Sequence, residues 1–243
     1  MPARDLVSRD LHRLALGERA VDYVLVRRRG RRGVGLRVDE NGLTVSAPST
    51  MPLVRIEALV RESERWVLRK VEEWRARQVP PVRWHDGAEL PFLGEALVLR
   101  LHAAARPVAE REGGELLVKA PAQAGESAIR LAVVGWYRRV ALPFLSERVA
   151  SLAERAAIAP PRVFVSSAMA RWGSCNSRRE VRLAWRLVKA PPPLIDYVVC
   201  HELAHLRHMN HSRAFWAEVE RQCPEYRALR RQLFATDHLY RSF

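Results

Sequence analysis

The feature that most constrains this 243-residue chain is an HExxH pattern, which runs from His201 to His205 and carries Glu202 after its first histidine. On a helix, positions i and i+4 lie one above the other. His201 and His205 can therefore present imidazole nitrogens to one metal ion, with Glu202 beside them. This spacing is typical of a helix that holds a catalytic zinc ion, Zn2+, and the sequence thus predicts a metal-dependent hydrolase.

Such a zinc site needs one more protein ligand. The ring of His208 would lie ~10 Å along the helix from His201, too far for imidazoles that bind zinc at ~2 Å. His211 can serve if the helix ends near Asn210, because Asn tolerates the left-handed conformation found at helix C-termini. Ser212 can then begin a new helix. A glutamate ligand stays the alternative, and the candidates are Glu218, Glu220 and Glu225.

The residues before the motif also favour a buried metal-bearing helix. Three prolines at 191–193 suit a helix entry, and Asp196 lies near the positive end of that helix. Most of the following side chains are apolar, so the two histidines and the glutamate would be buried and would need partners. A metal ion provides them; the competing interpretation is a histidine pair that is only hydrogen-bonded.

Four stretches together resemble one known family: Arg171–Cys175, Arg182–Leu187, Ile195–Leu206, and Asn210–Ser212 with Phe215 and Trp216. They are similar to the YgjP-like metallopeptidase family, relatives of the SprT-like proteases. The resemblance is close over about residues 130 to 235 and covers the amino-terminal part only by its general pattern.

This resemblance implies a zincin-like catalytic domain in which His201, His205 and His211 bind zinc and Glu202 is the catalytic base. Ala184 stands where members commonly have Asn before the Trp, which affects a contact around the ligands or with the substrate, not the metal itself. The resemblance leaves the substrate open between peptides and nucleotides.

Composition indicates a globular chain. The hydrophobic content of 48% permits one large or two small domains. No apolar run approaches the ~18 residues of a membrane span, and the amino terminus lacks the apolar core of a secretory signal, so we expect no membrane association and a cytoplasmic location. Three cysteines without paired spacing fit reduced thiols.

The formal net charge of +14 favours a nucleic acid or nucleotide as a partner besides a protein or peptide substrate. Its densest part is the cluster Arg27–Arg32, at the tip of an expected hairpin between residues 23–26 and 34–38. These arginines either bind phosphates or form a solvated turn. Few aromatic residues accompany them, so a platform that stacks single-stranded bases is not indicated.

We predict an α+β fold in three parts: a polar lead at 1–20, a β-rich α+β region at 21–122, and a zincin-like metallohydrolase domain at 125–243. The middle region would contain an antiparallel sheet and one long helix over Pro52–Arg77. The boundary would fall at Pro121–Gly125. A second helix would span Glu126–Ala157, where Pro143 can bend it.

Zinc-activated water would hydrolyse a peptide bond, with Glu202 taking the proton from the water and passing it to the leaving amine. Tyr226, His208 and Arg171 are candidates for stabilising the oxyanion. The alternatives are a metal-dependent nucleotide phosphohydrolase and a protease recruited to nucleic acid. Cleavage preference and oligomeric state do not follow from the sequence.

Overall fold

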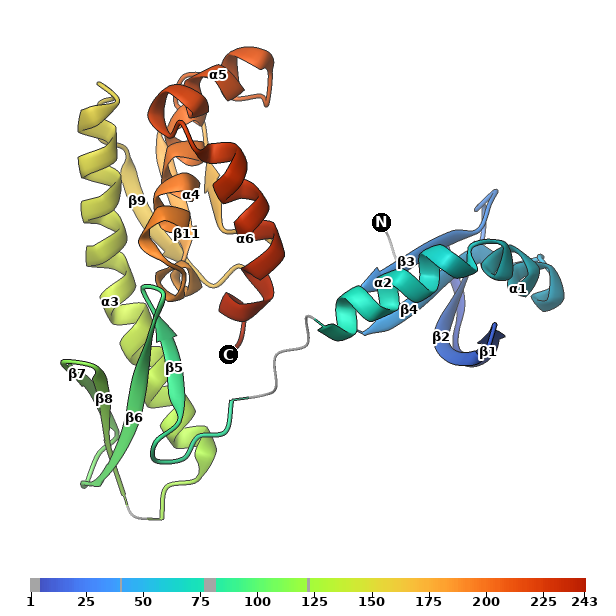
Figure 1. Ribbon diagram of the computed structural model, residues 1–243, viewed down its shortest axis with the longest axis horizontal. Coiled ribbons are helices and arrows are strands. Elements are labelled where there is room, and N and C mark those ends of the chain that lie inside the picture. Colours follow the sequence, from blue (N-terminus) through green and yellow to red (C-terminus); the bar gives the residue numbers. More distant parts are fainter. Residues whose placement is uncertain (1–4, 40, 77–81, 122) are drawn as a thin grey trace. The chain divides into compact units, whose positions relative to one another are not determined.

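The computed structural model describes residues 5–39, 41–76, 82–121 and 123–243 (Figure 1). The chain forms two compact units, Met1–Gln78 and Val79–Phe243. The boundary expected at Pro121–Gly125 therefore falls inside the second unit. The physical reason is that the strands before it pack against the helix after it, so the two share one core.

The first unit begins with a four-stranded sheet in the order β1-β2-β4-β3. Its strands are β1 (Leu6–Leu16), β2 (Arg19–Arg28), β3 (Gly35–Asp39) and β4 (Gly42–Pro48). The expected antiparallel sheet is corrected to a mixed one, because β2 and β4 pair in parallel. The expected polar lead is also corrected: it forms β1, whose Leu14 and Leu16 point into the core while Ala15 between them is exposed.

Two helices cover this sheet, α1 (Leu53–Glu62) and α2 (Glu64–Ala76), where one long helix was predicted. Ser63 separates them because its backbone (φ −98°, ψ 13°) leaves the helical region and its N–H donates to the carbonyl of Val60 three residues back. Both helices contribute to a core with the sheet, as Ile56, Val60 and Val67 are fully buried. Arg77, the predicted helix end, lies outside the described residues.

The arginine cluster covers the end of β2 and the connection to β3, which is not a hairpin because β4 lies between these strands. Arg27 donates to the carbonyl oxygens of Ser49 and Met51, at 3.2 and 2.7 Å. Arg31 folds back to the carbonyl of Gly33 at 2.7 Å. Two guanidinium groups of the cluster thus hold the local backbone.

The second unit contains two more sheets. One has the order β5-β6-β8-β7, built from β5 (Glu89–Phe92), β6 (Glu95–Ala103), β7 (Val108–Glu112) and β8 (Glu115–Ala120). The other has the order β10-β11-β9, built from β9 (Arg162–Ser166), β10 (Gly173–Cys175) and β11 (Glu180–Ala184). The strands β5 and β6 pair in antiparallel and form a hairpin at the start of the first of these sheets.

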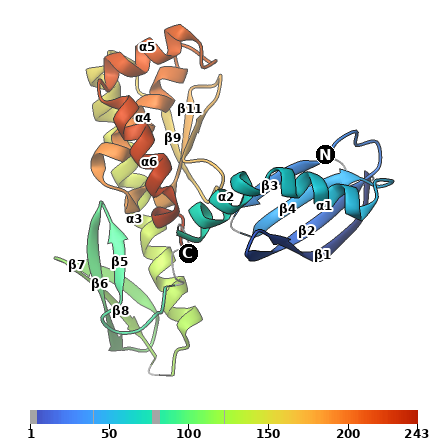
Figure 2. The ribbon, with the colours of Figure 1, turned by 45° about the vertical axis from the view of Figure 1, so that its right-hand side comes forward.

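A single helix, α3 (Glu126–Arg155), runs past both sheets of this unit (Figures 1 and 2). It matches the predicted helix at its start and ends two residues earlier, and it continues through Pro143. Val133, Tyr137 and Leu145 are among its fully buried residues. The helix therefore joins the strands before it and after it into one apolar core.

The last part of the chain is helical: η2 (Trp185–Lys189, a 3-10 helix), α4 (Pro192–His205), α5 (Arg213–Gln222) and α6 (Tyr226–Tyr240). The predicted α+β class is therefore confirmed. The helix α4 lies between α3 and α6 (Figure 1), and its side chains are mostly buried. Arg148 of α3 donates from Nε and Nη2 to the two carboxylate oxygens of Asp196 on α4, at 2.9 and 2.5 Å, and fixes the two helices in register.

The turn between β5 and β6 fixes the point at which α4 begins. The N–H of Leu93 donates to the carbonyl of Val188 at 2.7 Å. Gly94 has φ of +83°, and a Cβ there would lie 2.9 Å from the Cα of Pro191. Only glycine fits such a left-handed, close approach, so the first sheet of this unit is tied to the residue that precedes α4. Among the described residues, no helix has the length and apolar character to cross a membrane.

Candidate metal centre

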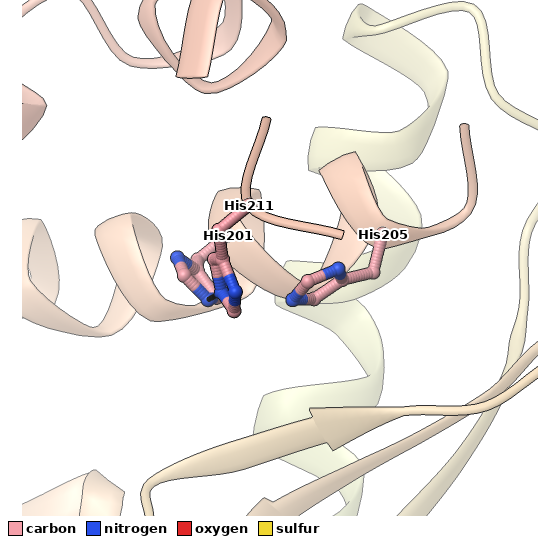
Figure 3. Close-up of side chains that lie close together, drawn as sticks. All are labelled: His201, His205 and His211. Carbon is pink, nitrogen blue, oxygen red and sulfur yellow. Dashed lines mark hydrogen bonds between the residues drawn. The ribbon is translucent and has the colours of Figure 1, made fainter. Parts of the chain in front are cut away.

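The helix α4 and the loop after it bring three imidazoles together. His201 and His205 lie one turn apart on α4, and α4 ends at His205. The chain then turns back, and Ser212 caps α5 by accepting a hydrogen bond from the N–H of Phe215 at 3.4 Å. This reversal places His211 against His201, with their Nε2 atoms 3.2 Å apart (Figure 3).

The three rings have the spacing that a metal ion requires. One nitrogen from each of His201, His205 and His211 lies within 4.8 Å of the others. Nitrogens that surround a tetrahedral zinc ion at ~2.0–2.1 Å are roughly 3.3 Å apart, so the 3.2 Å pair already has this separation. The other separations are at most 4.8 Å, so the three imidazoles could hold one ion. The donors are all imidazole nitrogens, which suit zinc.

A backbone contact fixes the orientation of His205. Its Nδ1 lies 3.1 Å from the carbonyl oxygen of His208. A carbonyl can only accept a hydrogen bond, so Nδ1 carries the proton and Nε2 is left with a free lone pair. Metal-binding histidines are commonly oriented in this way. His208 thus contributes its main chain, and its ring does not belong to the cluster.

Aromatic side chains surround the imidazoles and keep two of them neutral. The rings of His205 and Phe215 are 4.5 Å apart, and Trp216 lies 5.8 Å from both His201 and His211. Burial lowers the pKa of His201 to about 4, and the neighbouring histidines add to the effect. Burial also lowers the pKa of His205. Both rings are therefore neutral at physiological pH, which is the form that binds metal.

Glu202 is a buried carboxylate with an unsatisfied oxygen among the described residues. The residue is only 5% exposed, and its Oε2 atom has no hydrogen bond to any described residue. Burial raises the pKa of Glu202 to about 7, against the opposing charge of Arg171. A carboxyl group that is half protonated near neutral pH can both accept and return a proton.

The backbone of β10 packs so closely against this carboxylate that no side chain fits at Gly173. A Cβ at Gly173 would lie 2.5 Å from Oε1 of Glu202, 2.7 Å from its Cγ and 2.8 Å from its Cδ. These distances are well below van der Waals contact. The glycine therefore lets β10 approach the side chain of Glu202 and confine it.

We expect Gly173→Ala to lower the catalytic rate by about 100-fold, the cost of a ~1 Å misplacement of a catalytic group, without removing bound metal. The new methyl group would push Glu202 aside while the imidazoles stay in place. Turnover and metal content of the purified variant check this. Gly114→Ala is the matched control, because a Cβ there meets no atom within 4 Å. A Gly173→Ala enzyme with full activity would contradict the role given to this contact.

The alternative glutamate ligands do not join the imidazoles. Glu218 is held by Arg221 at 2.7 Å and by Arg207 at 3.4 Å. Glu220 pairs with Arg227 at 3.7 Å, and the main-chain carbonyl of Glu225 accepts the first hydrogen bonds of α6. Glu218 has a structural role instead: through Arg207 it ties the loop that carries His211 to α5.

The candidates for oxyanion stabilisation lie at different places around the site. The ring of Tyr226 stacks on Trp216 at 5.6 Å, and its hydroxyl accepts a hydrogen bond from Arg227 at 3.1 Å. Arg171 is close enough to Glu202 for its charge to act on the carboxylate. The contact of Gly173 with Glu202 was not predicted from the sequence. The only available signal was the position of this glycine inside the stretch Arg171–Cys175.

An α+β domain that gathers three imidazoles beside a buried carboxylate defines the class of metal-dependent hydrolases. The chain matches the model of the YgjP-like metallopeptidase domain over residues 32–236. It belongs to the YgjP-like metallopeptidase family, which confirms the family predicted from the motifs.

Individual relatives are more distant. A UTP pyrophosphatase of Escherichia coli K12 is 35% identical over 57 residues, which cover 24% of this chain and 34% of that protein. The match thus spans about a third of that relative's length.

Two solved structures are also similar in part. The metallopeptidase zymogen abylysin of Pyrococcus abyssi has 20% identity and a TM-score of 0.35, over 38% of this chain and 95% of that one. The metallopeptidase zymogen jannalysin of Methanocaldococcus jannaschii has 19% identity and a TM-score of 0.32, over 37% and 96%. Similarity at this level does not bear on the site.

Proposed function

We propose that the protein is a zinc-dependent metallopeptidase in which His201, His205 and His211 hold Zn2+ and Glu202 is the general base. One observation carries the proposal: three gathered imidazoles accompany a buried carboxylate whose Oε2 has no hydrogen-bond partner among the described residues. Three nitrogen donors favour zinc over Mg2+, which prefers oxygen ligands. When bound, zinc acts as a Lewis acid and lowers the pKa of a coordinated water toward ~7.

Glu202 supplies the proton transfers of this reaction. Its carboxylate accepts a proton from the attacking water and then gives it to the nitrogen of the leaving amine. The pKa of about 7 suits both steps, because neither protonation state dominates at neutral pH. Gly173 and the neighbouring main chain confine the carboxylate, so that little motion is needed between the two transfers.

The sheet beside the site favours an extended peptide as substrate. The strand β10 is at the edge of its sheet, with β11 as its one neighbour among the described strands. Its residue Gly173 touches Glu202. An edge strand offers main-chain hydrogen bonds to an added strand, so a peptide aligned there would pass the catalytic carboxylate.

A second candidate function is hydrolysis of a nucleotide. Two observations favour it: a relative that matches part of the chain is a UTP pyrophosphatase, and the net charge of +14 attracts anions. The same charge also favours a protease that nucleic acid recruits, through residues such as the arginines at 27–32. For either function, three imidazole donors suit zinc or a transition metal better than Mg2+.

Side-by-side assays of casein and UTP separate these functions. We expect the zinc-loaded protein to cleave casein, chelation to abolish cleavage, and added zinc to restore it. UTP should be unchanged throughout. Metal-dependent turnover of UTP without cleavage of casein would refute the peptidase and support the second candidate.

A further inference from the structure

A cavity of about 680 Å3 lies along α6 in the second unit. Aromatic residues form part of its wall, namely Trp172, Tyr197 and Tyr226, and arginines of α6 form another part, namely Arg227, Arg230 and Arg231. Phe234, which is 70% exposed, also lines it. We call this cavity the arginine pocket.

Residues that line the arginine pocket neighbour residues of the metal centre. Tyr197 lies one turn before His201 on α4, and the two rings are 6.2 Å apart. Tyr226 stacks on Trp216, which in turn contacts two of the imidazoles. Trp172, which also lines the pocket, directly precedes Gly173, the residue that packs against the side chain of Glu202. A substrate that reaches the metal centre could therefore also extend into the pocket.

The charges of the pocket are not balanced. Its one acidic residue, Asp237, is held by Arg241 at 2.8 Å. Arg227 has Glu220 at 3.7 Å. Arg230 lies over the ring of Trp216 at 4.8 Å and has no carboxylate within ion-pair distance in the described part of the chain. Arg231 has neither a hydrogen bond nor an ion pair with any residue that the structure describes. Arg230 and Arg231 thus have no carboxylate partner among the described residues, and the pair of Arg227 with Glu220 is exposed and weak, so guanidinium groups of the pocket can bind an anion.

We propose that the arginine pocket is a subsite for acidic side chains of a peptide substrate, a step that rests on the proposed peptidase function. Arginines bind carboxylates through paired hydrogen bonds, and aromatic walls pack against the methylene groups of Glu. The extent of the cavity suits several residues of extended chain.

The spacing of the arginines supports a peptide over a compact ligand. Arg227 and Arg231 are four residues apart on α6 and lie on one face, with ~6 Å between their Cβ atoms. In an extended peptide, every second side chain points the same way, with a repeat of roughly 6.6 Å. Two acidic residues separated by one other residue can therefore each meet one arginine.

Binding of two labelled peptides tests the subsite without cleavage. The probes are fluorescein-Ala-Glu-Ala-Glu-Ala-Ala and its analogue with Gln for both Glu, and the protein is the full chain, loaded with zinc and carrying Glu202→Gln. We expect Arg231→Glu in this background to weaken binding of the acidic peptide about 10- to 100-fold, the size of one charge-assisted hydrogen bond. Binding of the Gln peptide should change less than about 3-fold.

The control variant is Arg106→Glu, an equal charge reversal at an exposed position outside the pocket. We expect it to change both affinities less than about 3-fold. Equal binding of the two peptides, or equal losses in Arg231→Glu and Arg106→Glu, would overturn the subsite. UTP that competes in an Arg231-dependent manner and is hydrolysed, while the acidic peptide binds weakly, would also overturn it in favour of a nucleotide.

A cleavage assay with protein that keeps Glu202 separates failure of the peptidase proposal from failure of the subsite proposal. With both correct, kcat/KM for the acidic peptide exceeds that for the Gln peptide, and Arg231→Glu removes the difference. Arg231-dependent binding without cleavage of any peptide would support the binding site and refute the peptidase. Metal-dependent cleavage of both peptides at the same rate would leave the peptidase and refute the subsite.

Discussion

Replacing Glu202 by Gln is expected to lower kcat for peptide hydrolysis by about 100- to 10,000-fold, the range that a general base contributes, while zinc stays bound at one ion per chain. The amide has the shape of the carboxylate but cannot take a proton from water. Because the imidazoles are separate from the Glu202 side chain, the metal site should survive the change. Turnover of a fluorogenic peptide and metal analysis of the same sample measure both effects.

Glu154→Gln is the matched control, since Glu154 is exposed near the end of α3 and the substitution removes the same charge. It should keep normal activity. Undiminished turnover in Glu202→Gln would reject Glu202 as the base. A loss of zinc along with activity would instead indicate that Glu202 helps to hold the metal.

Replacing His211 by Ala is expected to remove both the zinc and the activity. The two histidines of α4 would then be the only imidazole ligands left in the cluster. Loss of a residue that merely supports a ligand already weakens metal binding about 10- to 100-fold, so loss of a ligand should exceed ~100-fold. Zinc affinity measured by competition with a chelating dye gives the comparison.

His208→Ala tests whether any histidine near the site would have the same effect. The carbonyl of residue 208 orients His205, and this variant keeps that carbonyl while it removes the ring. We expect zinc affinity close to that of the unchanged protein. A His208→Ala variant that loses zinc as severely as His211→Ala would contradict the assignment of the third ligand.

The candidate site could be predicted because its main part is local in sequence. The positions of His201, Glu202 and His205 follow from helix periodicity alone. His211 required a reversal of the chain, and Asn210 and Ser212 supply residues that suit a helix end and a helix start. The structure brings the three imidazoles together as this argument expected. Their role in binding zinc stays a prediction until the metal is measured.

Features that depend on distant pairing could not be predicted. The parallel pairing of β2 with β4 is set by which strands meet in space, and strand periodicity carries no signal for it. The same holds for the unit boundary, because the strand region before Pro121 shares its core with α3. The interruption at Ser63 was missed, since the apolar spacing continues across it.

The close contacts of the site were also beyond the sequence. A glycine pattern does not reveal that β10 presses on Glu202, because residues 173 and 202 meet only through the packing of α4 on the sheet. The arginine pocket likewise combines residues of α4, α6 and the segment before β10. Net charge indicated an anionic partner, but it gave no location for the charge that faces the site.

The most direct test of the central claim is X-ray absorption at the zinc edge of the purified, zinc-loaded protein, with His211→Ala beside it. We predict three imidazole nitrogens and one further light atom at ~2.0–2.1 Å in the unchanged protein, and loss of one imidazole or of the zinc itself in the variant. A sulfur scatterer at ~2.3 Å, or four protein ligands with no open position, would contradict a hydrolytic zinc centre built from His201, His205 and His211.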